Sequence, residues 1–232
     1  MIFSDNIRLI IGVLTIFIVV FCLLNSLFFK SKHVLTSKLI SRVAIFSSIS
    51  TILYVVPYFK FALPFFPSFL EFHFDEVPAL ISGFAYGPVC AFFVILIKTL
   101  IKLPFSTSLA VGETADFIYS LAFVLPACFI YKKNRNFKGA IIGLLISSLL
   151  QVVVASLITS FVILDFYMFV MGLSKETLIK MCQLANKNVT SLGWTFFFYF
   201  GIPFNLLKDL FVIVITILLY KKMHGLIDKI KN

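Results

Sequence analysis

Apolar runs long enough to cross a lipid bilayer dominate the sequence. About 20 apolar residues make one helical crossing, and five runs approach or exceed this length: 7–29, 39–56, 113–131, 139–164 and 195–220. Of the 232 residues, 61% are hydrophobic and 13% are charged, whereas about a quarter of a soluble domain is charged. The sequence therefore predicts an all-α integral membrane protein with a single membrane domain.

The apolar stretch 77–103 is interrupted by Gly87 and Pro88. Proline lacks an amide N–H and restricts the residue before it, so a helix rarely continues through such a pair. We expect two shorter helices, at about 77–87 and 88–103, joined by a tight turn. With the five runs, this predicts seven membrane helices. We count 7–29 among them because it is too long for a signal peptide and a single positive charge leads it.

Basic residues are concentrated in short segments between the apolar runs. The net charge is +10, and twelve of the 20 Lys and Arg residues lie in 30–42, 132–138 and 221–231. If the predicted helices alternate in direction, all three segments lie on one side. Cytoplasmic loops carry the excess of Lys and Arg, so we expect the N-terminus outside the cell membrane and the C-terminus in the cytoplasm. The charge is therefore a topology signal, and we expect no nucleic-acid partner.

Two segments on the opposite side are too long for simple turns. Residues 57–76 are rich in proline and phenylalanine, and residues 165–194 contain a possible short helix near 174–186. Apolar loops on that side could cover a pocket or lie on the lipid headgroups. Composition leaves both possibilities open.

Polar residues inside the predicted spans are the strongest functional candidates. An ionisable group inside a span costs on the order of 2.5–3.5 kcal/mol. Asn205 and Lys208 are three residues apart and share one helix face. They could line a polar ligand pocket, or Lys208 could form a structural ion pair. Lys98 is a second cation inside a span, and it could extend along its apolar stem to the outer interface.

Acidic residues are concentrated in two places, and those of the first place could pair with these lysines. Glu113 and Asp116 begin a predicted helix, where acids also stabilise the helix dipole. They face the outer half of the predicted bundle, within reach of Lys98 and Lys208. In the stretch EFHFDE, alternation would place Glu71, His73 and Asp75 on one face, where a metal ion is conceivable. No second His or Cys cluster supports that site, so we predict no metal and expect Asp75 to cap the next helix.

No arrangement of a nucleophile with a base is readable in the sequence, so we do not expect an enzyme. A phosphate-binding loop of the G-x-x-x-x-G-K-[ST] type is also missing, so the chain does not hydrolyse ATP through that motif. A self-sufficient secondary transporter would favour internal repeats and acids near the membrane midplane. We find no internal repeat.

Three stretches resemble, in this order, the S component of an energy-coupling factor (ECF) vitamin transporter. They are DEVPALISGFAYGPVCAFFVILIKTLIK, GETADFIYSLAFVLPACFIYKK and GIPFNLLKDLFVIVITILLY. The riboflavin-specific type is the most similar, and LANKNVTSLGWTFFFYFGIPFNLLK also resembles it. The resemblance implies a six-helix substrate-binding domain at 38–222, preceded by an extra transmembrane helix and basic loop at 1–37 and followed by a basic tail at 223–232.

The resemblance also implies a function and partners. The chain would capture riboflavin or a related flavin at the outer face, without a cofactor of its own. It would work with a membrane coupling subunit and two cytoplasmic ATPase subunits. An S component for a different vitamin and a self-sufficient secondary transporter remain the alternatives.

Site residues follow from the family pattern. The P-F-N-x-x-K positions that contact the flavin correspond to Asn205 and Lys208, and the small residues that face the coupling subunit correspond to Ala44 and Ser48. The chain departs from the riboflavin pattern at Thr99, Asp116 and Thr159, where the pattern has asparagine. The full expected substrate-binding set comprises Asn205, Lys208, Thr159, Lys98, Glu113 and Asp116.

Overall fold

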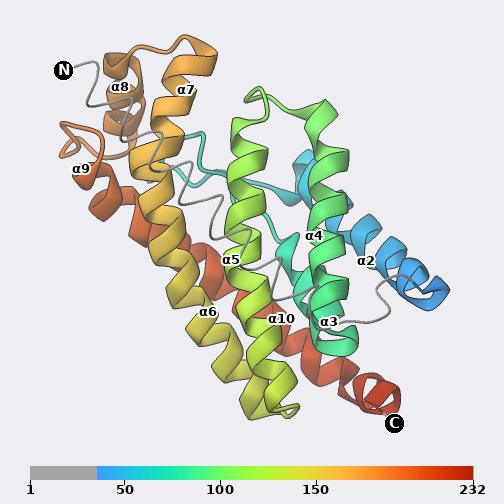
Figure 1. Cartoon of the computed structure of the whole chain (residues 1–232). Coiled ribbons are helices and arrows are strands. Elements are labelled where there is room, and N and C mark those ends of the chain that lie inside the picture. Colours follow the sequence, from blue (N-terminus) through green and yellow to red (C-terminus); the bar gives the residue numbers. More distant parts are fainter. Residues whose placement is uncertain (1–35, 232) are drawn as a thin grey trace.

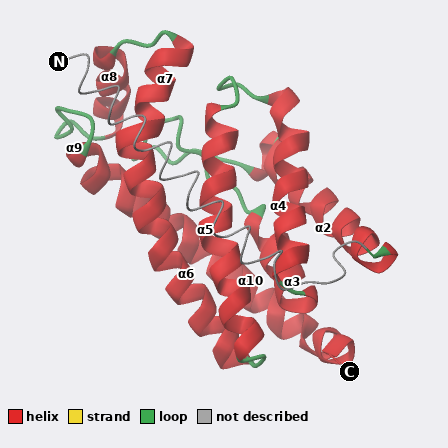
Figure 2. Ribbon diagram, in the orientation of Figure 1, coloured by secondary structure: helices red, strands yellow, loops and turns green. Residues whose placement is uncertain are grey.

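The computed structural model describes residues 36–231, and this part of the chain is almost entirely helical (Figure 2). Within it β-pairing is limited to one isolated antiparallel bridge, between Phe61 and Phe72. The predicted all-α class is therefore confirmed for the described residues. The predicted first span, 7–29, lies outside them.

Five helical segments of the described chain are long and apolar enough to cross a membrane. They are Ser37–Val55, Pro88–Phe105, Val111–Lys133, Phe137–Met171 and Trp194–Lys222. The helices within and between them are α2 (Ser37–Val55), α3 (Glu76–Tyr86), α4 (Pro88–Lys102), α5 (Val111–Lys133), α6 (Phe137–Ile158), α7 (Leu164–Met171), α8 (Lys175–Ala185), α9 (Trp194–Phe196) and α10 (Ile202–Lys231).

The predicted break at Gly87-Pro88 is confirmed. Helix α3 ends at Tyr86 and α4 starts at Pro88, with Gly87 between them at φ 99°. A positive φ of this size suits glycine because it has no side chain to clash with the backbone. At about 1.5 Å per residue, the 11 residues of α3 span about 16 Å, roughly half of a bilayer core of about 30 Å. The start of α3 therefore lies deep in the bundle.

The helix predicted at 139–164 is longer than expected. Helix α6 continues through a π-helical turn, η3 (Thr159–Ile163), into α7, so Asp165 lies in a helix and not in the outer segment. A second π-helical turn, η4 (Phe197–Gly201), joins α9 to α10 and packs against η3. The predicted short helix near 174–186 is present as α8.

The helix order gives the bundle two different ends (Figure 1). The start of α2, the α3–α4 turn, the α5–α6 turn and the end of α10 meet at one end, which we call the basic end. Helix α5 lies near the centre, packed against α3, α4 and α6. At the other end, residues 56–75 connect α2 to α3, and Phe72 of this connection is completely buried.

Candidate functional site

A pocket of about 330 Å³ lies between the 56–75 connection, helices α5, α7, α8 and α10, and the π-helical turn η3. Five of the six predicted substrate-binding residues line it: Glu113, Asp116, Thr159, Asn205 and Lys208. The sixth, Lys98, lies behind the pocket wall, where its ammonium contacts Asp116. The structure thus brings together residues that are almost 100 positions apart in the sequence.

The 56–75 connection forms one wall of the pocket. Ser68, Phe69, Leu70 and His73 all line it. The ring of Phe69 stacks on Phe196, with ring centroids 6.2 Å apart. Of the two possibilities left open for this apolar segment, the structure supports the first, because the segment covers a pocket.

Six charged or ionisable side chains form an ionic cluster beside the pocket: His73, Asp75, Glu76, Lys98, Asp116 and Lys208. Lys208 Nζ lies 3.1 Å from Glu76 Oε1 and 3.6 Å from Asp116 Oδ1. Lys98 Nζ lies 3.0 Å from Asp116 Oδ2 and also pairs with Asp75. Each member of the cluster is at most 8% exposed.

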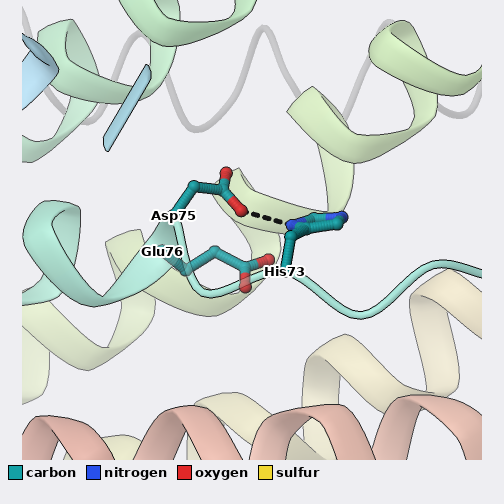
Figure 3. A group of neighbouring side chains, drawn as sticks. All are labelled: His73, Asp75 and Glu76. Atoms are coloured by element: carbon teal, nitrogen blue, oxygen red, sulfur yellow. Dashed lines mark hydrogen bonds and ion pairs between the residues drawn. The ribbon is translucent and has the colours of Figure 1, made fainter. Parts of the chain in front are cut away.

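His73 connects two of the acids in this cluster. Its Nδ1 contacts Asp75, as Figure 3 shows, and its Nε2 lies 3.4 Å from Asp116 Oδ1. Burial alone would raise the pKa of the Asp75 carboxyl, but Lys98 and His73 hold that pKa well below its usual range. Three carboxylates thus face two ammonium groups, and the His73 ring lies between two of the carboxylates.

Burial makes this charge balance important. A buried charge without a partner costs several kcal/mol, whereas a paired and hydrogen-bonded charge is tolerated. The cluster adds hydrogen bonds to its ion pairs, because Lys98 Nζ also donates to Ser120 Oγ at 2.9 Å. Its lysines and acids are thus parts of one structure, and they also supply the polar side of the pocket.

The group His73, Asp75 and Glu76 has the composition of a metal site. Its candidate ligand atoms lie within 4.8 Å of one another. Lys98 already pairs with Asp75, and Lys208 with Glu76. Lysine ammonium groups thus occupy the positions at which a cation would neutralise these acids. Glu71, predicted to share this face, instead pairs with Lys60 at 2.9 Å.

Two expectations about individual residues are wrong. Lys98 does not extend to the outer interface, because it is completely buried and paired with acids. Asp75 occupies the N-cap position of α3, but its side chain accepts no hydrogen bond from the helix. It points to His73 and Lys98 instead. In both cases the opposite charge nearby outweighs the local preference.

Glu113 and Asp116 have different environments although both lie near the start of α5. Glu113 accepts hydrogen bonds from Ser106 Oγ at 2.7 Å and Ser108 Oγ at 3.0 Å. Asp116 belongs to the ionic cluster. Helix capping therefore describes neither residue completely, since both also line the pocket.

The chain departs from the riboflavin pattern at three positions, and the structure shows which of these residues line the pocket. Asn205 donates to Gly201 O at 2.8 Å, and Thr159 is 2.8 Å from the Tyr119 hydroxyl. Thr99 donates to Ile95 O within its own helix at 2.9 Å and is not part of the pocket wall. Asp116 and Thr159 are thus the departures that change the pocket.

Sequence reasoning missed the role of His73 and Glu76 in the cluster. The sequence pattern offered His73 only as one of three residues on a face of EFHFDE, and it assigned no role to Glu76. The two lysines inside apolar runs were the available signal, because buried ammonium groups require acids nearby. The acids closest to a span boundary, in EFHFDE, were the obvious partners.

Ala44 and Ser48 lie on the side of α2 that faces away from the bundle, and both are exposed. The side of α2 that packs against the bundle carries Val43, Ser47 and Ser50. The hydroxyl of Ser48 donates to Ala44 O at 2.8 Å, so it needs no hydrogen-bond acceptor from another subunit. The side chains at these two positions are small, and the Ser48 hydroxyl already has an acceptor. Among the described residues nothing covers them, so a neighbouring helix could approach closely.

Comparison with known proteins agrees with the fold. The family model "ECF transporter, substrate-specific component" matches residues 38–220. Riboflavin transporter RibU of Staphylococcus aureus (strain TCH60) is 32% identical over 82% of this chain and 93% of the relative. Riboflavin transporter FmnP of Bacillus subtilis (strain 168) is 27% identical over 82% of this chain and 95% of the relative.

A solved structure of the S component of a bacterial ECF transporter superposes with a TM-score of 0.63. It is 30% identical, and the similarity covers 82% of this chain and 96% of that chain. Sequence and fold therefore agree that this chain belongs to the family of ECF transporter substrate-specific components.

Proposed function

We propose that this chain is the substrate-capture subunit of an ATP-driven ECF importer, and that it binds riboflavin or a related flavin in the pocket. The main observation is the pocket itself, in which aromatic walls meet a buried polar side. Its volume of about 330 Å³ falls within the range of small-molecule sites, about 300–1,000 Å³. The names of the relatives, both riboflavin transporters, support the same ligand.

The chemistry of a flavin matches a pocket that has aromatic walls and one polar side. Its flat ring has an apolar edge and a polar edge, on which an N–H lies between carbonyl oxygens. Phe69, Phe196 and Phe204 supply aromatic surface, and aromatic rings pack well against flat ligands. Lys208 is a donor for a carbonyl oxygen, while Asp116 is an acceptor for the N–H.

A related vitamin is the second candidate, and Asp116 and Thr159 favour it. An asparagine side chain both donates and accepts, whereas a carboxylate accepts only. Asp116 therefore requires a donor at the ligand edge that it faces. Thr159 is shorter than asparagine and already bonds to Tyr119, which leaves more room for a substituent on that side.

We also propose the partners and the orientation. The exposed small residues Ala44 and Ser48 allow close approach of a helix from a membrane coupling subunit, and two cytoplasmic ATPase subunits would supply the energy. The basic end would face the cytoplasm, so the C-terminus is inside and the N-terminus outside. Residues 38–222 form the six-helix substrate-binding domain, with an additional transmembrane helix in 1–37 and a basic tail at 223–232.

Absorbance of the purified chain tests the ligand directly. We expect a yellow flavin spectrum to accompany the protein, and added riboflavin to lose its fluorescence on binding. If the chain neither carries a flavin nor quenches its fluorescence, and another vitamin stabilises it against melting, then that vitamin is the ligand. Uptake into vesicles that lack the coupling subunit and ATPases would instead identify a self-sufficient transporter.

A further inference from the structure

A second cavity, of about 230 Å³, lies at the basic end, at the opposite end of the helices from the pocket described above. It is enclosed by α2, the α3–α4 turn and the C-terminal part of α5. Apart from Tyr86 and the buried Tyr131, its ionisable lining residues are the cations Arg42, Lys132 and Arg135. No aspartate or glutamate of the described residues lines it.

The shape of this cavity depends on the α3–α4 turn. Gly87 forms part of the wall, and a Cβ added to it would meet open space. The C-terminus of α3 and the N-terminus of α4 meet here, so their dipoles oppose each other. The positive character of the cavity therefore comes from its three cationic side chains.

One of these cations is held in place by an aromatic ring. The guanidinium carbon of Arg42 lies 4.2 Å from the centroid of the Tyr86 ring. Stacking of this kind fixes the planar group while leaving its N–H donors available in the plane. Arginine groups in such a position suit bidentate recognition of phosphate oxygens.

We propose that this cavity binds the phosphate of an anionic lipid headgroup. The cavity lies at helix ends, where the headgroups of a surrounding bilayer are located, and basic pockets between transmembrane helices bind such groups. Ile45, three residues from Arg42 on α2, is 61% exposed and offers apolar surface for an acyl chain. The bound lipid would hold α2, the α3–α4 turn and α5 together at this end.

The test measures lipid retained by the purified chain, using native mass spectrometry with phosphatidylglycerol and phosphatidylcholine in equal amounts. We expect preferential retention of phosphatidylglycerol. The double variant R42Q/R135Q should weaken this retention on the order of 30-fold, because two cations near the lipid are lost. The matched control, K221Q/K222Q, removes the same charge from exposed residues on α10 and should retain the lipid.

A third variant keeps the charge and removes the space. Ala85 lines the cavity, and A85L would fill part of it. We expect A85L to lose phosphatidylglycerol as R42Q/R135Q does, while both variants melt normally in phosphatidylcholine and still quench riboflavin. Retention by A85L equal to that of the unmodified chain would overturn the cavity as the lipid site.

Three other results would also overturn the proposal. Equal losses in R42Q/R135Q and K221Q/K222Q would show that surface charge as a whole retains the lipid. Stabilisation of the lipid-free chain by glycerol phosphate would assign the cavity to a soluble phosphate. If R42Q/R135Q retained the lipid but lost binding of the coupling subunit, the cavity would be assigned to an acidic segment of that subunit.

Discussion

Replacing Lys208 by methionine is expected to destabilise the folded chain, and not simply to weaken ligand binding. Glu76 is completely buried, and its Oε1 accepts from Lys208 at 3.1 Å and more weakly from Ser120 at 3.4 Å. Its Oε2 has no hydrogen-bond partner among the described residues. Breaking such a buried pair by removing one partner costs about 3–5 kcal/mol, because the remaining charge is left unpaired.

A second substitution separates stability from binding. The double variant K208M/E76Q removes both charges of the pair, and we expect it to recover most of the lost stability, since neutral replacement of a buried pair is often tolerated. If Lys208 also donates to the ligand, the double variant should still bind riboflavin about 5- to 150-fold more weakly, corresponding to about 1–3 kcal/mol.

The measurements are thermal melting and quenching of riboflavin fluorescence on both variants. Lys60→Met is the matched control for the melting measurement, because Lys60 pairs with Glu71, which is 48% exposed at its side chain, and pairs near the surface contribute about 0–1 kcal/mol. Normal melting and unchanged affinity of K208M would refute both roles of Lys208. Failure of E76Q to rescue K208M would mean that Glu76 is not the partner that governs stability.

Three further experiments test the topology, the coupling surface and the specificity of the pocket. Cysteine at Arg135 should react with a membrane-impermeant reagent only from inside, and cysteine at Leu70 only from outside; the reverse pattern would invert the orientation. Tryptophan at Ala44 and Ser48 should abolish uptake while leaving riboflavin quenching intact, and a loss of quenching would place them in the bundle core. Asp116→Asn should keep normal melting, since two carboxylates then face two ammonium groups, and bind riboflavin about fivefold more weakly. Unchanged affinity would remove Asp116 from the ligand contacts, and tighter binding would favour the related vitamin, because asparagine stands at this position in the riboflavin pattern.

The parts of the fold that follow from local sequence were predictable. The turn at Gly87 was predicted because proline and glycine act within one or two residues of their own position. The long apolar runs were predicted because lipid requires each crossing segment to satisfy its own backbone hydrogen bonds. The end of α6 was misjudged, because Asp165 suggested an outer loop and the helix continues through a π-helical turn.

The candidate site depended on contacts that local sequence does not encode. Lys208 and Glu76 are 132 positions apart, and several acids could have paired with either lysine. The family pattern supplied Asn205, Lys208 and Thr159 as candidates, and the pocket includes all of them. It did not supply His73, whose burial depends on how deeply the 56–75 connection enters the bundle.

The two adjacent π-helical turns, Thr159–Ile163 and Phe197–Gly201, carry a consequence for how this chain can vary. A π-helical turn accommodates one extra residue within a helix, and one residue corresponds to about 100° of helical rotation. Deleting a residue from Thr159–Ile163 would restore regular α-helix and rotate α7, which carries no member of the ionic cluster. Deleting one from Phe197–Gly201 would rotate α9 relative to α10, which carries Lys208. Insertions and deletions that alter the pocket rim should therefore be tolerated inside these helices, and not only in the connecting loops.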